Sequence, residues 1–117
     1  MMASPIAKGK LPKKKVMNNI QSKALQMAKD YGLDADAMTR FADLVSELGE
    51  LGKELVKSTS YGKEPLKAND AIKMELGDVI FALALLANET GLDIEECFEK
   101  TYEKCRQRFE TKGHIGS

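Results

Sequence analysis

The chain has 117 residues, which is enough for one domain with a single hydrophobic core. Its 18 basic and 18 acidic residues balance, but five lysines lie within residues 1–15, which hold no acid, so the remainder is acidic overall. An acidic body argues against general nucleic-acid binding, and no apolar run reaches the ~20 residues that a membrane span requires.

Residues 1–15 are rich in lysine, with glycine and proline, and lack the apolar segment of a secretory signal. They predict a disordered basic tail, which is a solvated leader or, alternatively, a docking arm for an anionic partner. The first helix is expected over residues 16–31, where Gly32 ends it. The second is expected over residues 35–57 with Asp34 as N-cap.

The third helix is expected over residues 65–90, because Pro65 suits a first turn. Its segment Val79–Ala87 is apolar on every side, so we expect this helix to form a dimer interface. Gly91 ends it, and Asp93 caps a fourth helix over residues 94–112. No segment shows the alternating apolar and polar pattern of a β-strand. The expected fold is therefore all-α, a four-helix bundle in one domain over residues 16–112, followed by a flexible tail at 113–117.

Two acidic pairs with i,i+3 spacing are the candidate site. Glu47 and Glu50 lie on the second expected helix, and Glu75 and Asp78 lie on the third. Residues three apart share a helix face, so two facing helices can present four carboxylates to one point. Oxygen ligands of this kind suit Mg²⁺ or Mn²⁺, which usually serve substrate phosphates. Lys100, Lys104 and Arg108 form a basic ribbon that can hold phosphate oxygens.

Other interpretations of the same residues stay open on spacing alone. Glu47 and Glu50 also fit a solvated helix face. Glu75 and Asp78 border the apolar run, where a buried salt bridge is the alternative. Lys104 and Arg108 also fit ordinary cations near a helix C-terminus, where the helix dipole favours them.

Several chemistries are excluded by the residues that are present. The single histidine, His114, lies in the C-terminal tail, which argues against di-iron carboxylate sites and histidine-assisted nucleophiles. Cys97 and Cys105 are eight residues apart on one expected helix, too far for a disulfide. Two unpaired cysteines fit a reducing, cytoplasmic location.

Three segments together resemble the MazG-type nucleotide pyrophosphohydrolases of the all-α NTP pyrophosphatase superfamily. They are Ser46–Leu55 (SELGELGKEL), Glu75–Asp93 (ELGDVIFALALLANETGLD) and Glu99–Phe109 (EKTYEKCRQRF). The resemblance implies a Mg²⁺-dependent or Mn²⁺-dependent enzyme that hydrolyses a nucleoside triphosphate to the monophosphate and pyrophosphate. It also implies dimers or dimer-built tetramers and a house-cleaning role in the nucleotide pool.

The same resemblance implies roles for individual residues. Glu47, Glu50, Glu75 and Asp78 match the four metal-binding acids, and Glu47 and Glu50 are the candidate catalytic carboxylates. Lys104, Arg108 and Asn88 match phosphate-binding positions. Relatives often carry a second glutamate before the first metal acid, where this chain has Ser46. The general base therefore stays open among a metal-activated water, Glu47, Glu50 and Glu54.

Two further functions compete with this prediction. One is a non-catalytic helical interaction module, in which the acids only solvate the bundle. The other is an enzyme of the same fold restricted to deoxynucleotides such as dUTP or dCTP. Candidate stacking residues for the base are Tyr31, Phe41, Tyr61 and Phe81, and base preference does not follow from them.

Overall fold

The computed structural model of the chain describes residues 19–113, and these residues form an all-α structure. The expected tail at 1–15, the first residues of the expected domain, and residues 114–117 lie outside the described residues. The described part contains no strand and has four helices: α1 (Asn19–Tyr31), α2 (Ala37–Ser58), α3 (Asp70–Thr90) and α4 (Ile94–Lys112). The predicted all-α class is confirmed.

The starts of α2 and α3 differ from the predicted positions, because better caps follow the predicted ones. Asp36, not Asp34, caps α2, and its carboxylate accepts a hydrogen bond from the Thr39 amide at 2.8 Å. That bond lowers the pKa of Asp36. Asn69 caps α3 by accepting from the Ile72 amide at 2.8 Å, so Pro65 lies in the connecting loop. An Asp or Asn cap accepts a hydrogen bond from a free N–H of the first helical turn. Proline has no N–H of its own, but it offers no acceptor for the other free N–H groups.

The turn between α3 and α4 matches the prediction. Gly91 ends α3 with φ 73°, a left-handed conformation that glycine adopts without steric cost. Asp93 caps α4, and its carboxylate accepts from the Glu95 amide at 3.1 Å. The bounds of α4 agree with the expected residues 94–112.

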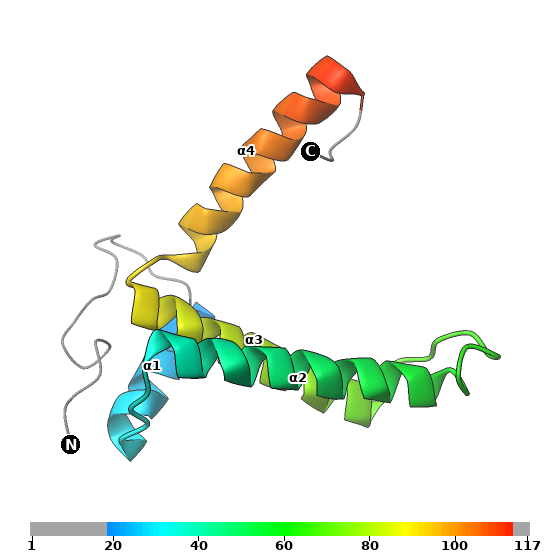
Figure 1. Cartoon of the computed structure of the whole chain (residues 1–117), viewed down its shortest axis with the longest axis horizontal. Helices are drawn as coiled ribbons and strands as arrows, with labels where there is room; N and C mark the ends of the chain where they lie inside the picture. Colours follow the sequence, from blue (N-terminus) through cyan, green and yellow to red (C-terminus); the bar gives the residue numbers. More distant parts are fainter. Residues whose placement is uncertain (1–18, 114–117) are drawn as a thin grey trace.

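The four helices do not close into a bundle within one chain. In Figure 1, α2 and α3 run side by side as a helical hairpin, α1 lies against one end of it, and α4 projects away. The core forms where α1 meets α3 and consists of Ala24, Leu25, Ala28, Ala84 and Leu85, with Phe81 and Ile94 packed against it. The expected four-helix bundle is therefore corrected to a three-helix body with an extended fourth helix, because within residues 19–113 the apolar stripe of α4 has no helix packed along it.

A buried glutamine fixes the point from which α4 departs. The side chain of Gln21 is fully buried, and its amide nitrogen donates to the Leu92 carbonyl at 2.7 Å. Its amide oxygen accepts from the Ile94 amide at 3.0 Å. Asn88, also fully buried, donates to the Gln21 carbonyl at 3.2 Å. Because buried polar groups require such partners, these bonds hold α1, the end of α3 and the start of α4 together.

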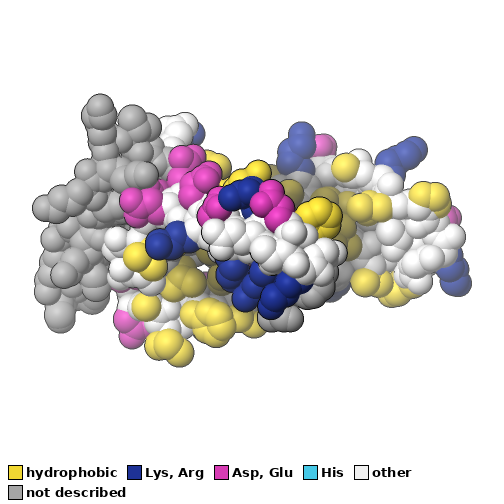
Figure 2. Space-filling view, turned by 90° about the horizontal axis from the view of Figure 1, so that it is seen from above, with side chains coloured by type: hydrophobic (Ala, Val, Ile, Leu, Met, Phe, Trp, Pro, Cys, Tyr) yellow, Lys and Arg dark blue, Asp and Glu magenta, His cyan; other side chains and the backbone are white. Residues whose placement is uncertain are grey.

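Large apolar side chains remain exposed on all four helices, and those on α1 are Ile20, Met27 and Tyr31. On α2 they recur at i, i+3, i+7 and i+10, which places them on one face. Figure 2 shows hydrophobic side chains reaching the surface in several places among charged groups. On the other three helices the exposed side chains include Met38, Phe41, Val45 and Leu48 on α2, Leu76, Ile80 and Leu83 on α3, and Phe98, Tyr102 and Phe109 on α4.

Candidate metal centre

The α2–α3 hairpin brings carboxylates from both acidic pairs to one place. Glu47 on α2 faces Glu75 and Asp78 on α3, and one carboxylate oxygen from each lies within 4.8 Å of the others. Glu47 and Glu75 are half-buried, and Asp78 is exposed. The three residues come from two helices that run past each other, so the two i,i+3 pairs meet across the contact.

Negative charge accumulates around Glu75. Burial is the main cause that raises the pKa of Glu75, and the charges of Asp78, Glu50, Glu47 and Glu54 raise it further. Partial desolvation and like charges both disfavour the ionised form. A bound cation would relieve both effects, since it supplies the opposite charge that these oxygens lack.

Glu50 lies beside the three-carboxylate group rather than in it. Its carboxylate is half exposed and lies 3.6 Å from the Lys53 ammonium. Glu54, one turn further along α2, is largely shielded from water, at 17% side-chain exposure, and lies 3.9 Å from the Lys57 ammonium. Glu54 is not among the four acids that the family resemblance matched to metal binding. The sequence signal for it is its i,i+4 spacing from Glu50, which places both on one face of α2.

The donor set fits a hard divalent ion. Mg²⁺ and Mn²⁺ prefer carboxylate oxygens, usually take only one or two from the protein, and keep several waters. The three converging carboxylates can supply those one or two ligands, and the exposed side at Asp78 leaves room for water and phosphate oxygens. Glu47, Glu75 and Asp78 are the residues that would hold the ion.

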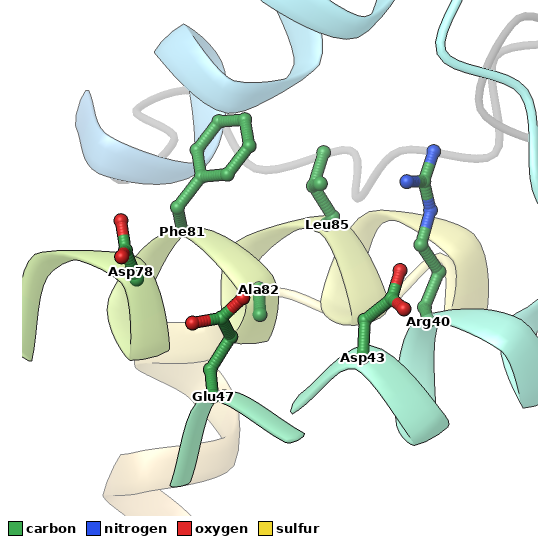
Figure 3. A pocket seen from close by; sticks show the side chains of 7 residues that line it. All are labelled: Arg40, Asp43, Glu47, Asp78, Phe81, Ala82 and Leu85. Carbon is green, nitrogen blue, oxygen red and sulfur yellow. The ribbon is translucent and has the colours of Figure 1, made fainter. Parts of the chain in front are cut away.

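A groove between α2 and α3 leads away from the acidic group. Its volume is about 280 Å³, and it is lined by Arg40, Asp43, Glu47, Asp78, Phe81, Ala82 and Leu85. Figure 3 shows Asp43, Glu47 and Arg40 projecting from α2 and the remaining side chains from α3. One end is acidic, the wall along α3 is apolar, and the other end carries Asp43 and Arg40. We call this space the α2–α3 groove.

Arg40 closes the far end of the groove and was not singled out from the sequence. It is 6% exposed, donates to the Leu33 carbonyl, and lies 3.9 Å from the carboxylate of Glu89, which is also buried. A buried charge needs an ionic partner. A sequence signal existed, because Glu89 follows an almost wholly apolar segment and needed a cation.

The three residues matched to phosphate binding are not gathered at the acidic group within this chain. Asn88 lies ten residues beyond Asp78 on α3, about 15 Å along the helix, and is bonded to Gln21 in the core. Lys104 and Arg108 lie on α4, which points away from the hairpin (Figure 1). Neither forms a salt bridge within residues 19–113, whereas Arg106 pairs with Glu103 and Glu110.

Sequence comparison identifies the family to which the chain belongs. The model of the MazG nucleotide pyrophosphohydrolase domain matches residues 36–112, which span α2, α3, α4 and all the acids discussed above. The chain belongs to this family. The MazG match excludes α1, which supplies part of the core but none of the carboxylates.

One curated relative of this MazG-family chain is an uncharacterized protein of Bacillus subtilis (strain 168), YpjD. It is 35% identical over 74 residues, which cover 61% of the present chain and 65% of the relative, just under two thirds of its length. No solved structure gives a significant match. Within residues 19–113, no helix has the length and apolar character needed to cross a membrane.

Proposed function

We propose that this MazG-family chain is a Mg²⁺-dependent nucleoside triphosphate pyrophosphohydrolase that converts an NTP or dNTP to the monophosphate and pyrophosphate. Family membership supports nucleotide pyrophosphohydrolysis in general. The observation that carries the proposal is the meeting of Glu47, Glu75 and Asp78 at the acidic end of a groove. Mn²⁺ is the alternative ion, because it accepts the same ligands.

The reaction forms a bond between a water oxygen and the α-phosphorus and breaks the bond between that phosphorus and the bridging oxygen of the β-phosphate. Pyrophosphate leaves with the bridging oxygen, and the water loses a proton. When bound, Mg²⁺ neutralises phosphate charge and lowers the pKa of nearby water. Glu47, Glu75 and Asp78 are the residues that would hold and orient the ion.

We propose that Glu50 is the general base that accepts the proton lost by the attacking water. Its carboxylate is half exposed and adjoins the acidic group without belonging to the three converging oxygens. Its charge acts on Glu75, so the two carboxylates are close enough to interact. Ser46 occupies a neighbouring position but its hydroxyl is a poor base near neutral pH. Glu47 would contribute to the reaction by holding the ion.

We further propose that the working form is a homodimer or a dimer of dimers. Support comes from the exposed apolar side chains of α2, α3 and α4, because apolar side chains that share an exposed helix face mark surfaces for protein association. In such an assembly α4 of one copy can lie against the hairpin of the other. That arrangement would bring Lys104 and Arg108 to the phosphates of the partner's substrate, where charge stabilisation is needed.

The role we propose is removal of unwanted nucleotides from the pool, in the cytoplasm. The test is pyrophosphate release from a panel of NTPs and dNTPs, including dUTP and dCTP, with Mg²⁺ and with EDTA. We expect Mg²⁺-dependent release with the monophosphate as co-product. Glu75→Gln and Asp78→Asn should abolish release, whereas Glu64→Gln, in the exposed α2–α3 loop, should retain it.

The same panel separates the non-catalytic alternative. The exposed apolar faces also fit an interaction module, in which the acids would be merely solvated. If no nucleotide releases pyrophosphate and millimolar Mg²⁺ leaves the melting temperature unchanged, the interaction module is supported. A specific increase with Mg²⁺ that Asp78→Asn removes supports the metal centre, because a ligand that binds only the folded state stabilises it.

A further inference from the structure

The α2–α3 groove continues well past the acidic group. Asp78 and Leu85, both in its lining, are seven residues apart on α3, which corresponds to about 10 Å along the helix axis. The volume of about 280 Å³ lies at the low end for ligand pockets and suits a nucleoside rather than a whole triphosphate. If an ion and phosphates occupy the acidic end, the remainder of the substrate extends toward Asp43.

The wall of the groove fits a flat ring. Ala82 and Leu85 are 7% and 6% exposed, and Phe81 is half-buried beside them. Figure 3 places these three side chains on one helix, with Asp43 on the opposite one. A nucleobase has two apolar faces and a polar edge, and its faces stack readily on aromatic side chains. The wall therefore accommodates the face of a base and leaves its edge for the polar end.

The polar end offers an acceptor. The charge of Arg40 is already matched by Glu89, and its guanidinium donates to the Leu33 carbonyl. Asp43 is exposed and, within residues 19–113, makes no hydrogen bond or ion pair. An ionised carboxylate only accepts hydrogen bonds. Of the two polar side chains at this end, Arg40 is 6% exposed and Asp43 is exposed, so the group that meets the edge of a bound base is the Asp43 carboxylate, which has two acceptor oxygens.

We propose that Asp43 is a specificity-determining residue that selects guanine nucleotides, an inference that rests on the proposed function of this site. Guanine presents two adjacent donors, its ring N1–H and its 2-amino group, which match the two carboxylate oxygens in a paired contact. Hypoxanthine keeps the ring N1–H and lacks the amino group. Adenine and cytosine place a ring-nitrogen acceptor beside their amino group, and uracil places its N–H between two carbonyl oxygens, so each sets an acceptor against Asp43.

The test measures equilibrium binding of GTP, ITP and XTP, with ATP, CTP and UTP as further ligands, in Ca²⁺ and under conditions where turnover is checked to be absent. We expect the wild-type protein to bind GTP about tenfold or more tightly than ITP, since one hydrogen bond to a charged group separates them. Asp43→Asn converts one acceptor oxygen into a donor. Because xanthine presents N1–H beside a carbonyl, this variant should reverse the order of GTP and XTP.

Asp30→Asn is the matched control, because it removes the same charge from an exposed position on α1, where Asp30 accepts a hydrogen bond from Gln26. It should keep the wild-type order of affinities. Equal binding of GTP and ITP by the wild-type protein, or an unchanged GTP-to-XTP ratio in Asp43→Asn with native helix content, would overturn the assignment. The binding assay tests this proposal separately from pyrophosphohydrolase activity. If pyrophosphate is released without any base preference, the role of Asp43 is rejected while the proposed activity stands.

Discussion

Replacement of Glu89 by glutamine tests the buried ion pair that closes the groove. The Arg40 and Glu89 side chains are 7% and 0% exposed and lie 3.9 Å apart. Glu89→Gln keeps the shape and removes the charge, which leaves the guanidinium buried without its counter-charge. Breaking a buried pair from one side costs about 3–5 kcal/mol. For a domain of this size, that loss corresponds to a decrease in melting temperature of roughly 12–40 °C.

Urea unfolding followed by circular dichroism at 222 nm measures the loss directly. Glu110→Gln is the matched control, because Glu110 pairs with Arg106 at 2.9 Å on exposed α4, where its side chain is 59% exposed. That change should cost about 0–1 kcal/mol. A double variant, Arg40→Met with Glu89→Leu, should recover most of the stability lost in Glu89→Gln, since an apolar pair of similar volume carries no desolvation cost. A loss below about 1 kcal/mol for Glu89→Gln would refute the inference of a desolvated pair.

Three other changes probe the acidic group, the exposed faces and the start of α4. The pKa of Glu75 is raised above 4.5 in the folded state, so ionisation of this carboxyl disfavours folding. The stability that the protonated Glu75 contributes is fully present below pH 4.5 and is lost as the pH rises through the folded-state pKa. Glu75→Gln should therefore raise the melting temperature of the metal-free protein at pH 7, and this gain should shrink toward pH 4.5. Leu48→Glu, on the exposed α2 stripe, should shift sedimentation toward the monomer, and an unchanged mass would argue against that face as the interface. Gln21→Ala removes two bonds to the turn before α4 and should cost about 1–3 kcal/mol in urea unfolding, whereas a neutral result would contradict its anchoring role.

Helix ends were predictable wherever the sequence offered a single strong cap. Gly91 followed by Asp93 leaves little choice for the junction of α3 and α4, and both were assigned correctly. The start of α2 had two aspartates in competition, and the nearer one to the helix, Asp36, provides the cap. Which of two aspartates, two residues apart, accepts from the free amide depends on the backbone angles of one or two residues, and apolar periodicity does not specify those angles.

The arrangement of the helices was less predictable than their existence. Apolar periodicity shows that a helix has a face to bury, but it does not identify the partner. Phe98 and Tyr102 gave α4 the stripe of a bundle helix, yet they are 60% and 54% exposed in the single chain. Their partner can lie in another copy, which one sequence does not distinguish from a partner in the same chain.

The acidic group was predictable because its members repeat a simple spacing, and three of the four carboxylates do converge. Arg40 and Gln21 were not predicted because each is one of many polar residues on an amphipathic helix, and nothing in its local spacing marks it as buried. Their partners, Glu89 and the Leu92 carbonyl, are 49 and 71 residues away in the chain. Pairing over such separations depends on how α1, α2 and α3 pack, so a charge beside an apolar segment, such as Glu89, indicates that a partner is needed but does not identify it.

The distribution of packing along the hairpin links the acids to stability. The core residues gather where α1 covers α3, at the end that holds Ala84 and Leu85. Toward the α2–α3 loop, Ile72 is buried, whereas Leu51, Leu55 and Val79 are only half-buried, and the acidic group lies in this half of the hairpin. Like charges weaken the contact where apolar burial is already small. An ion bound by Glu47, Glu75 and Asp78 would replace that repulsion with attraction. Metal binding would then stabilise the pairing of α2 and α3 in this half of the hairpin. The same three side chains would therefore bind the ion and control how tightly the groove is formed.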